Sequence, residues 1–330
     1  MNSKVTIYGS GVMGLCVATV LQDRGFSVDI LDPQLGPGPE SCSWWAGGML
    51  APDCESETSE QLIVDYGRLS ADWWQSRGVP VINNGSLVVA LNRDKSELKR
   101  FASRTQNHRM VDKQALCDME PHIGERFDRA LFMHRESHLD PRQALAQLKQ
   151  SLEVKGAKFK RTKTKDTPSP IIDCSGLAAN EVLPDLRGVK GEMVVLQSSD
   201  IDISRPVRLL HPRFPLYIVP RGEGIYMVGA TQIESEDRET ASLRSVVELL
   251  NAAYALHPAF AEAKVLEIGV GARPAFPDNL PRIVKIDETL HVNGLFRHGF
   301  LLAPALACKT VDYFLEQRKP EVWFDYNDER

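Results

Sequence analysis

Several features of common protein classes are missing from this 330-residue sequence. Its six cysteines form no CxxC pair, which argues against a zinc site or a disulfide framework and favours reduced thiols in a cytoplasmic compartment. No apolar run reaches the roughly 20 residues of a membrane-spanning helix, and no small-residue cleavage site follows the apolar N-terminus. We therefore expect a soluble, cytoplasmic protein without a cleaved leader or a membrane partner. The absence of a GxSxG sequence also excludes the nucleophile elbow of α/β-hydrolases.

An excess of basic charge is missing as well. The 39 lysines and arginines are outnumbered by 44 acidic residues, which gives a net charge of −5 and does not indicate nucleic-acid binding. The one basic run, residues 155–165, predicts a solvated strand and loop. His134 and His138 have the i, i+4 spacing of a metal pair, but the helix start signalled by Asp140 and Pro141 would place both before the helix. No metal site is therefore expected.

What the sequence does contain is a dinucleotide-binding fingerprint at its start. An apolar strand over residues 5–8 leads into a turn with Gly9, Gly11 and Gly14, followed by a helical pattern and a second strand that ends in Asp32. Gly9 allows the tight turn, Gly11 lets a pyrophosphate approach the backbone, and Gly14 lets the helix pack on the strand. The Asp32 carboxylate is placed to accept hydrogen bonds from ribose hydroxyls. A structural βαβ unit without phosphate is the alternative. Val12, Met13 and Pro33 are also predicted to contact the dinucleotide.

The length and the alternation of strands and helices predict two domains of the α/β class. We expect a discontinuous, Rossmann-like dinucleotide domain over residues 1–78, 138–188 and 272–330. A substrate domain of the α+β type, built on a mixed β-sheet, is expected over residues 79–137 and 189–271. The main expected elements are helices over 58–77, 94–106, 112–119, 141–154 and 243–255, and strands over 86–91, 193–197, 216–220, 225–230 and 290–293.

Four further segments carry a resemblance to a known family. They are residues 43–52, residues 216–221 with 228–231, residues 271–274, and residues 296–304. In this order they resemble segments of the D-amino-acid oxidase family of FAD-dependent oxidoreductases. Within the family the likeness is greatest to the glycine oxidase branch, which serves bacterial thiamin biosynthesis. The resemblance covers essentially the whole chain.

The resemblance implies non-covalent FAD and a set of residues that contact it. Gly47 and Gly48 would let backbone N–H groups approach the planar flavin ring, and a mobile glycine loop is the alternative. Residues 296–300 are expected to open the C-terminal helix, which begins near Ala303 and would direct its positive end toward the reduced flavin. Cys308, within that helix, is expected to be a core thiol and not a covalent flavin link. The implied cofactor contacts are Cys42, Ser43, Gly47, Gly48, Met49, Cys174, Ser175, Gly176, His298, Gly299, Phe300 and Leu301.

Three residues are candidates for the substrate site. Arg273 lies in an apolar strand, where its planar fork suits a substrate carboxylate, and the alternative is a structural ion pair. The resemblance implies that Tyr217 closes the substrate site with its hydroxyl and that Arg297 faces the substrate near the flavin. A packed tyrosine and a solvated loop arginine are the respective alternatives. Gln232 and His298 depart from the family pattern, and we expect Gln232 to be a buried amide in the pocket wall.

The implied reaction is the oxidation of glycine or another small amine by FAD, with hydride transfer from Cα and hydrolysis of the imine to glyoxylate or a keto acid plus ammonia. Dioxygen would reoxidise the flavin and yield hydrogen peroxide. A sarcosine or D-amino-acid oxidase or dehydrogenase of the same family is the main alternative. A nicotinamide-dependent dehydrogenase and a non-catalytic flavoprotein are alternatives from other classes. Whether the protein forms a homo-oligomer is left open.

Overall fold

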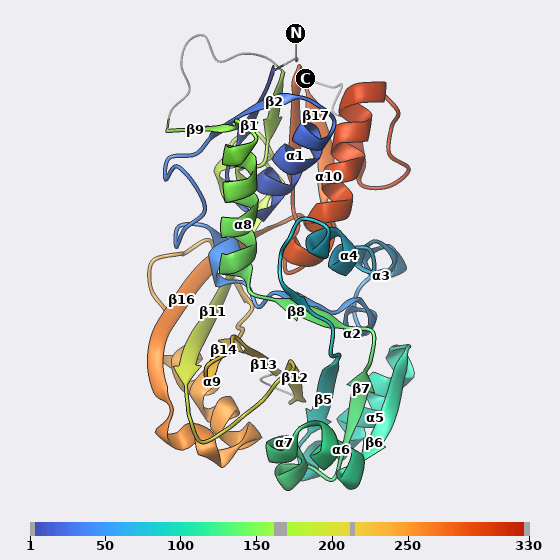
Figure 1. Ribbon diagram of the computed structural model, residues 1–330, viewed down its shortest axis with the longest axis vertical. Coiled ribbons are helices and arrows are strands. Elements are labelled where there is room, and N and C mark those ends of the chain that lie inside the picture. Colours follow the sequence, from blue (N-terminus) through green and yellow to red (C-terminus); the bar gives the residue numbers. More distant parts are fainter. Residues whose placement is uncertain (1–3, 162–169, 212–214, 327–330) are drawn as a thin grey trace.

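The computed structural model describes residues 4–161, 170–211 and 215–326. Residues 162–165 of the basic run lie outside this description. The described elements gather around two large β-sheets at opposite ends of an elongated molecule (Figure 1). No helix of the described residues is long and apolar enough to cross a membrane, and no group of three or more potential metal ligands occurs among them.

The first sheet contains the dinucleotide fingerprint. Among the described residues it has seven strands in the order β19-β17-β18-β10-β1-β2-β9. The strands at its centre, β18, β10, β1 and β2, are parallel to one another, as the fingerprint predicts, whereas β17 is antiparallel to β18. These strands are β1 (Lys4–Tyr8), β2 (Ser27–Leu31), β9 (Lys158–Lys160), β10 (Ile171–Asp173), β17 (Arg282–Ile286), β18 (Thr289–Asn293) and β19 (Phe324–Tyr326). They come from three stretches of the chain that are far apart in sequence, although the exact domain bounds stay a prediction.

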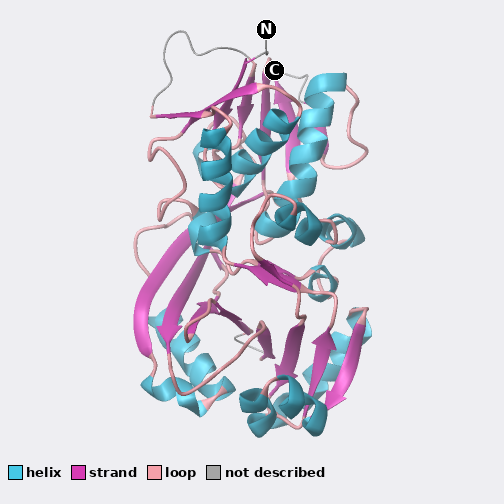
Figure 2. Cartoon of the chain, in the orientation of Figure 1, coloured by secondary structure: helices cyan, strands magenta, loops and turns pink. Residues whose placement is uncertain are grey.

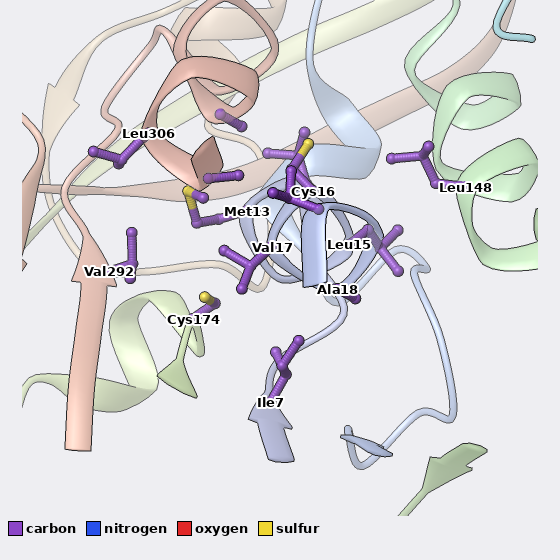
Figure 3. Packing of buried hydrophobic residues seen from close by; sticks show 14 of the residues in the cluster. Ile7, Met13, Leu15, Cys16, Val17, Ala18, Leu148, Cys174, Val292 and Leu306 are labelled. Carbon is purple, nitrogen blue, oxygen red and sulfur yellow. The ribbon is translucent and has the colours of Figure 1, made fainter. Parts of the chain in front are cut away.

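Helices α1 (Val12–Asp23), α8 (Pro141–Val154) and α10 (Gly299–Glu316) lie along one face of this sheet (Figure 1). Helix α1 is central and is buried along most of its length, because its residues are apolar on nearly every side. Figure 3 shows its side chains between Ile7 of β1, Leu148 of α8 and Leu306 of α10. The Asp140 carboxylate caps α8 by accepting from the backbone N–H groups of residues 142 and 143. This core fixes the glycine-rich turn that follows β1, an inner strand of the first sheet.

Helix α10 begins at Gly299, within the expected opening segment 296–300 and four residues before Ala303. Pro304 therefore lies inside the helix, where it cannot donate a hydrogen bond to the carbonyl of Phe300. The indole N–H of Trp74 donates to that carbonyl instead, at 2.9 Å. Trp74 is fully buried in α4, so a distant segment satisfies the group that the proline leaves open. The segment expected as a single helix over residues 58–77 forms two helices instead, α3 (Gln61–Gly67) and α4 (Ser70–Gln75).

The second sheet is mixed, and its strands are drawn in magenta in the lower half of Figure 2. Its described strands run in the order β15-β11-β14-β13-β12-β5-β7-β6, with β16 paired to β11, and β5 and β12 are parallel. They are β5 (Ser86–Ala90), β6 (His108–Asp112), β7 (Arg129–Met133), β11 (Arg187–Gln197), β12 (Val207–Leu210), β13 (Leu216–Pro220), β14 (Ile225–Gly229), β15 (Ile233–Glu234) and β16 (Lys264–Ala275). Its helices are α5 (Lys95–Arg104), α6 (Lys113–Met119), α7 (Pro121–Arg126) and α9 (Leu243–Leu256). The short elements β3 (Met49–Leu50), β4 (Val81–Ile82), β8 (Ser137–Leu139) and α2 (Pro52–Glu55) lie between the two sheets (Figure 1).

Candidate active site

A cavity of about 880 Å³ is lined by residues of both sheets and of the loops between them. This is the volume range of sites that hold small molecules or cofactors. Of the predicted site residues, all but Gly14 line it. They are Gly9, Gly11, Val12, Met13, Asp32, Pro33, Cys42, Ser43, Gly47, Gly48, Met49, Cys174, Ser175, Gly176, Tyr217, Arg273, Arg297, His298, Gly299, Phe300 and Leu301. Residues separated by up to about 290 positions are thus brought to one space, and Cys308 is not among them.

The three glycines of the first turn have different surroundings. A Cβ atom on Gly9, whose φ is +88°, would lie 2.6 Å from the Cys174 carbonyl oxygen. A Cβ on Gly14, which does not line the cavity, would lie 2.0 Å from the carbonyl oxygen of Gly9, so no side chain fits at this position. A Cβ on Gly11 would meet only the Ser41 and Ser43 hydroxyls, at 3.4 Å. Gly9 and Gly14 are therefore required by the backbone itself, whereas Gly11 leaves space on the side of the cavity.

Asp32 and Ser43 organise the wall beside this turn. One carboxylate oxygen of Asp32 accepts from the backbone N–H and the hydroxyl of Ser10, at 2.9 and 2.7 Å. The other accepts from the backbone N–H of Gln34 at 2.8 Å. The Ser43 hydroxyl accepts from the N–H of Val12, the first residue of α1, at 3.1 Å. These bonds hold the carboxylate at the end of β2 and bring the loop at residues 42–45 over the start of α1.

Arg221 fixes the glycine loop that the sequence analysis placed against the flavin. Its guanidinium donates to the carbonyl oxygens of Gly47 and Leu139, at 2.9 and 2.8 Å, and to that of Ala46 at 3.2 Å. Burial lowers the pKa of Arg221 to about 10. Sequence reasoning gave this residue no role, although its place at the end of an apolar strand, where a cation needs partners, was a usable signal. Arg221 positions the loop and does not line the cavity.

Arg273 reaches the cavity from β16 without an acidic partner. Its guanidinium donates one hydrogen bond, from Nη1 to the Thr231 carbonyl oxygen at 3.2 Å. Among the described residues no carboxylate lies within ion-pair distance of it. A Cβ on Gly191 of the paired strand β11 would lie 2.2 Å from Nη2, so this glycine makes room for the guanidinium. The structural ion pair that was the alternative is therefore not formed with any described residue.

Tyr217 lies on β13 and lines the same cavity. Its hydroxyl forms no hydrogen bond with the described part of the chain. Burial raises the pKa of Tyr217, although the nearby Arg273 and Arg208 act in the opposite direction. The hydroxyl therefore stays protonated at neutral pH and is free to donate to a ligand.

Arg297 lines the cavity but is not a free cation. Its guanidinium pairs with Glu55 at 2.8 Å and donates to the Thr58 hydroxyl at 2.7 Å. His298 Nε2 lies 2.9 Å from the same Glu55 oxygen, and Arg208 Nη2 lies 3.3 Å from the other. Neither Glu55 nor Arg208 was predicted. Although burial acts in the opposite direction, Arg297, His298 and Arg208 hold the pKa of the Glu55 carboxyl well below its usual range.

Gln232 differs from the expectation of a buried amide, because its side chain is exposed at the cavity wall. It follows the last residues of β14 and forms no side-chain hydrogen bond with the described residues. An exposed amide forms hydrogen bonds with water, so Gln232 carries no cost of burying an unpaired polar group.

Glu55→Gln is expected to lower the free energy of unfolding by about 2–3 kcal/mol at neutral pH, because it leaves two arginines without their shared carboxylate. Since the folded pKa of Glu55 is lowered, this stabilisation is present above the usual pKa of 4.5 and is lost as the pH falls below it. Urea unfolding at several pH values measures the difference. Glu60→Gln, in the same segment but exposed and unpaired in the described structure, should change stability by less than about 0.5 kcal/mol. Equal stability of Glu55→Gln and wild type at neutral pH would contradict the prediction.

Comparison with known proteins identifies the family of this chain. The family described as FAD dependent oxidoreductase (DAO) matches residues 4–312. The chain belongs to this family. A protein of Rhizobium etli, which carries a provisional name as the thiamine biosynthesis oxidoreductase ThiO, is 49% identical over 96% of this chain and 98% of its own length. Glycine oxidase of Bacillus subtilis is 23% identical over 97% of this chain and 95% of its own length.

Solved structures show the same fold. The crystal structure of glycine oxidase from Bacillus cereus superposes with a TM-score of 0.82 and 21% identity, covering 97% of this chain and 99% of that one. The predicted Rossmann-like fold with a mixed second sheet and the FAD cofactor are thereby confirmed. Membership of this oxidoreductase family excludes the nicotinamide-dependent dehydrogenase and the non-catalytic flavoprotein considered above.

Proposed function

We propose that this chain converts glycine, or another small amino acid or amine, with dioxygen and water into glyoxylate or the corresponding keto acid, ammonia and hydrogen peroxide. The observation that carries the proposal is Arg273, a guanidinium on the cavity wall without a carboxylate partner among the described residues. Its planar fork matches a substrate carboxylate. The names of the Rhizobium etli and Bacillus subtilis relatives support thiamine biosynthesis as the pathway and glycine as the substrate. The six free cysteines support a cytoplasmic location.

The residues of the cavity fit FAD. A Cβ on Gly11 would meet only the hydroxyls of Ser41 and Ser43, at 3.4 Å, and the N–H groups of Met13 and Gly14 precede Leu15, the first residue to bond back into the helix at Gly11. We place the pyrophosphate there and the adenosine ribose at Asp32. The start of α10 at Gly299 lines the flavin end of the cavity, and its positive dipole end favours negative charge on the ring. When bound, FAD supplies the redox chemistry, taking two electrons from the substrate and passing them to dioxygen.

The side chains of this protein bind and orient the substrate. Arg273 holds the carboxylate, and the unpaired Tyr217 hydroxyl donates a second hydrogen bond to it. Arg297, fixed by Glu55, closes the pocket on the side of α10. No side-chain base is required if the amine enters uncharged, so orientation and exclusion of water supply most of the rate enhancement.

Glycine added to the purified yellow protein without oxygen is expected to bleach its flavin absorption, because electrons then remain on the cofactor. Readmitted oxygen should restore the colour with formation of one hydrogen peroxide per glyoxylate. A panel of glycine, sarcosine, D-alanine and D-phenylalanine measures substrate size. Tyr217 and Arg297 restrict the room for a side chain, so kcat/KM for glycine or sarcosine should exceed that for D-phenylalanine by at least about tenfold.

The panel also separates the family alternatives. The best kcat/KM with sarcosine or D-alanine would replace glycine as the substrate while the amino-acid oxidase assignment stands. A preference for D-phenylalanine would refute the small-substrate assignment. Bleaching by glycine that oxygen does not reverse would show that the electrons pass to another acceptor.

A further inference from the structure

Arg208 is a cation on the cavity wall that the proposed reaction does not use. It lies on β12, directly opposite Tyr217 in the register with β13. It lines the same cavity as Arg273, and its side chain is 19% exposed. Arg208 and Arg273 are therefore two guanidinium groups that both lie near Tyr217.

The hydrogen-bonding capacity of Arg208 is largely unused. Its Nη2 approaches the Glu55 carboxylate at 3.3 Å, which is a long contact for a charged pair. Its Nε is buried and has no hydrogen-bond partner in the described structure. The Phe101 ring centroid lies 5.9 Å from its guanidinium carbon, which adds a cation–π contact but no acceptor. A guanidinium has five N–H donors and cannot lose its charge, so this environment leaves it undersatisfied.

The charges around Arg208 are also unbalanced. Arg208 and Arg297 share Glu55 as their one ion-pair partner among the described residues. Glu136 restores the balance only in part, because burial raises its pKa to about 7 and its carboxyl group already accepts from Ser86 and from the backbone N–H of Cys54. One positive charge beside the cavity is thus without a full counter-charge, and a ligand that enters the cavity is placed to supply it.

The geometry points to a second anion subsite at Arg208, which binds an acidic group that the substrate carries in addition to its α-carboxylate. The substrate class is then a small amino acid or secondary amine with two carboxylates, one held by Arg273 and the other by Arg208. The substrate carries the carboxylate held by Arg208 either on its amine substituent or on its side chain. This inference rests on the proposed function for the role of Arg273, and it extends that function beyond glycine.

Calorimetric titration of the FAD-loaded protein with unreactive acids tests the subsite directly. Acetate occupies one carboxylate position, whereas malonate, succinate and glutarate span increasing distances. At least one dicarboxylate is expected to bind about 10-fold or more tightly than acetate, the effect of one charged hydrogen bond. In Arg208→Met this advantage should fall below about threefold. Arg109→Met is the matched control, since Arg109 lies in the same sheet over a phenylalanine ring but outside the cavity, and it should keep the wild-type ratio.

Matched substrates give a second test that needs no variant. N-(carboxymethyl)glycine differs from sarcosine, and D-aspartate from D-alanine, by one carboxylate. Wild-type enzyme should show a KM about tenfold lower for the acidic member of at least one pair, and the pair that responds identifies the position of the acid. The subsite is ruled out if no dicarboxylate binds more tightly than acetate, or if the advantage survives in Arg208→Met. Because the calorimetry requires no turnover, failure of glycine oxidation would overturn the proposed function and leave the subsite standing.

Discussion

Arg273→Lys is expected to lower kcat/KM for the best amino-acid substrate by about 10- to 100-fold while leaving the fold intact. Lysine keeps the positive charge but loses the planar fork, and one charged hydrogen bond contributes about 1.5–3 kcal/mol. The fold should tolerate the change because the guanidinium makes a single hydrogen bond within the described part of the chain, to the Thr231 carbonyl oxygen. Steady-state kinetics and thermal unfolding of the same preparations separate the two effects.

Arg187→Lys provides the matched control. Arg187 lies at the start of β11, opposite the end of β16, and pairs with Glu234 and Asn279 without lining the cavity. Its substitution should change kcat/KM by less than about threefold, since it loses only an exposed pair. Unchanged turnover of Arg273→Lys with every amino-acid substrate would show that Arg273 does not hold the carboxylate.

The first sheet and the end of the cavity at the glycine-rich turn were predictable from local rules. The spacing of Gly9, Gly11 and Gly14 between two strands is a backbone requirement, and the clashes of a Cβ at Gly9 and Gly14 show that two of the three positions accept no other residue. The cap at Asp140 likewise depends on neighbours two and three positions away. Such features depend on short segments, so a single sequence is enough to place them.

The charged cluster beside the substrate position was not predictable in this way. Glu55 belongs to the four-residue helix α2, and its partner Arg208 lies 153 positions later on β12. No periodicity or spacing connects them, because only the meeting of the two sheets brings the side chains together. The compensation for Pro304 in α10 was equally unpredictable, because the indole that satisfies the open carbonyl lies 226 residues before it. Gln232 was misassigned because a sequence position at a strand end does not tell whether the side chain is buried.

Gly11→Val is expected to give a folded protein that does not retain FAD. The space beside Gly11 is open to the cavity, and its backbone has φ of −66°, a value that any residue adopts. A valine side chain would fill the place assigned to the pyrophosphate, so FAD affinity should fall by about 100-fold or more, equivalent to roughly 2.7 kcal/mol. The flavin-to-protein absorbance ratio after purification, and titration of the apoprotein with FAD, measure this loss.

Gly14→Ala distinguishes cofactor loss from fold loss in the same turn. The added Cβ would lie 2.0 Å from the Gly9 carbonyl oxygen, so α1 must move away from β1 and the apoprotein should unfold at a lower temperature. Gly11→Val apoprotein should instead unfold within a few degrees of the wild-type apoprotein, because a Cβ there meets only two hydroxyls at 3.4 Å. The pyrophosphate does not lie against Gly11 if that variant purifies with stoichiometric FAD. If Gly11→Val retains FAD and Gly14→Ala also unfolds at the wild-type temperature, the turn tolerates side chains at both positions, and α1 does not pack against the Gly9 carbonyl oxygen as closely as the structure indicates.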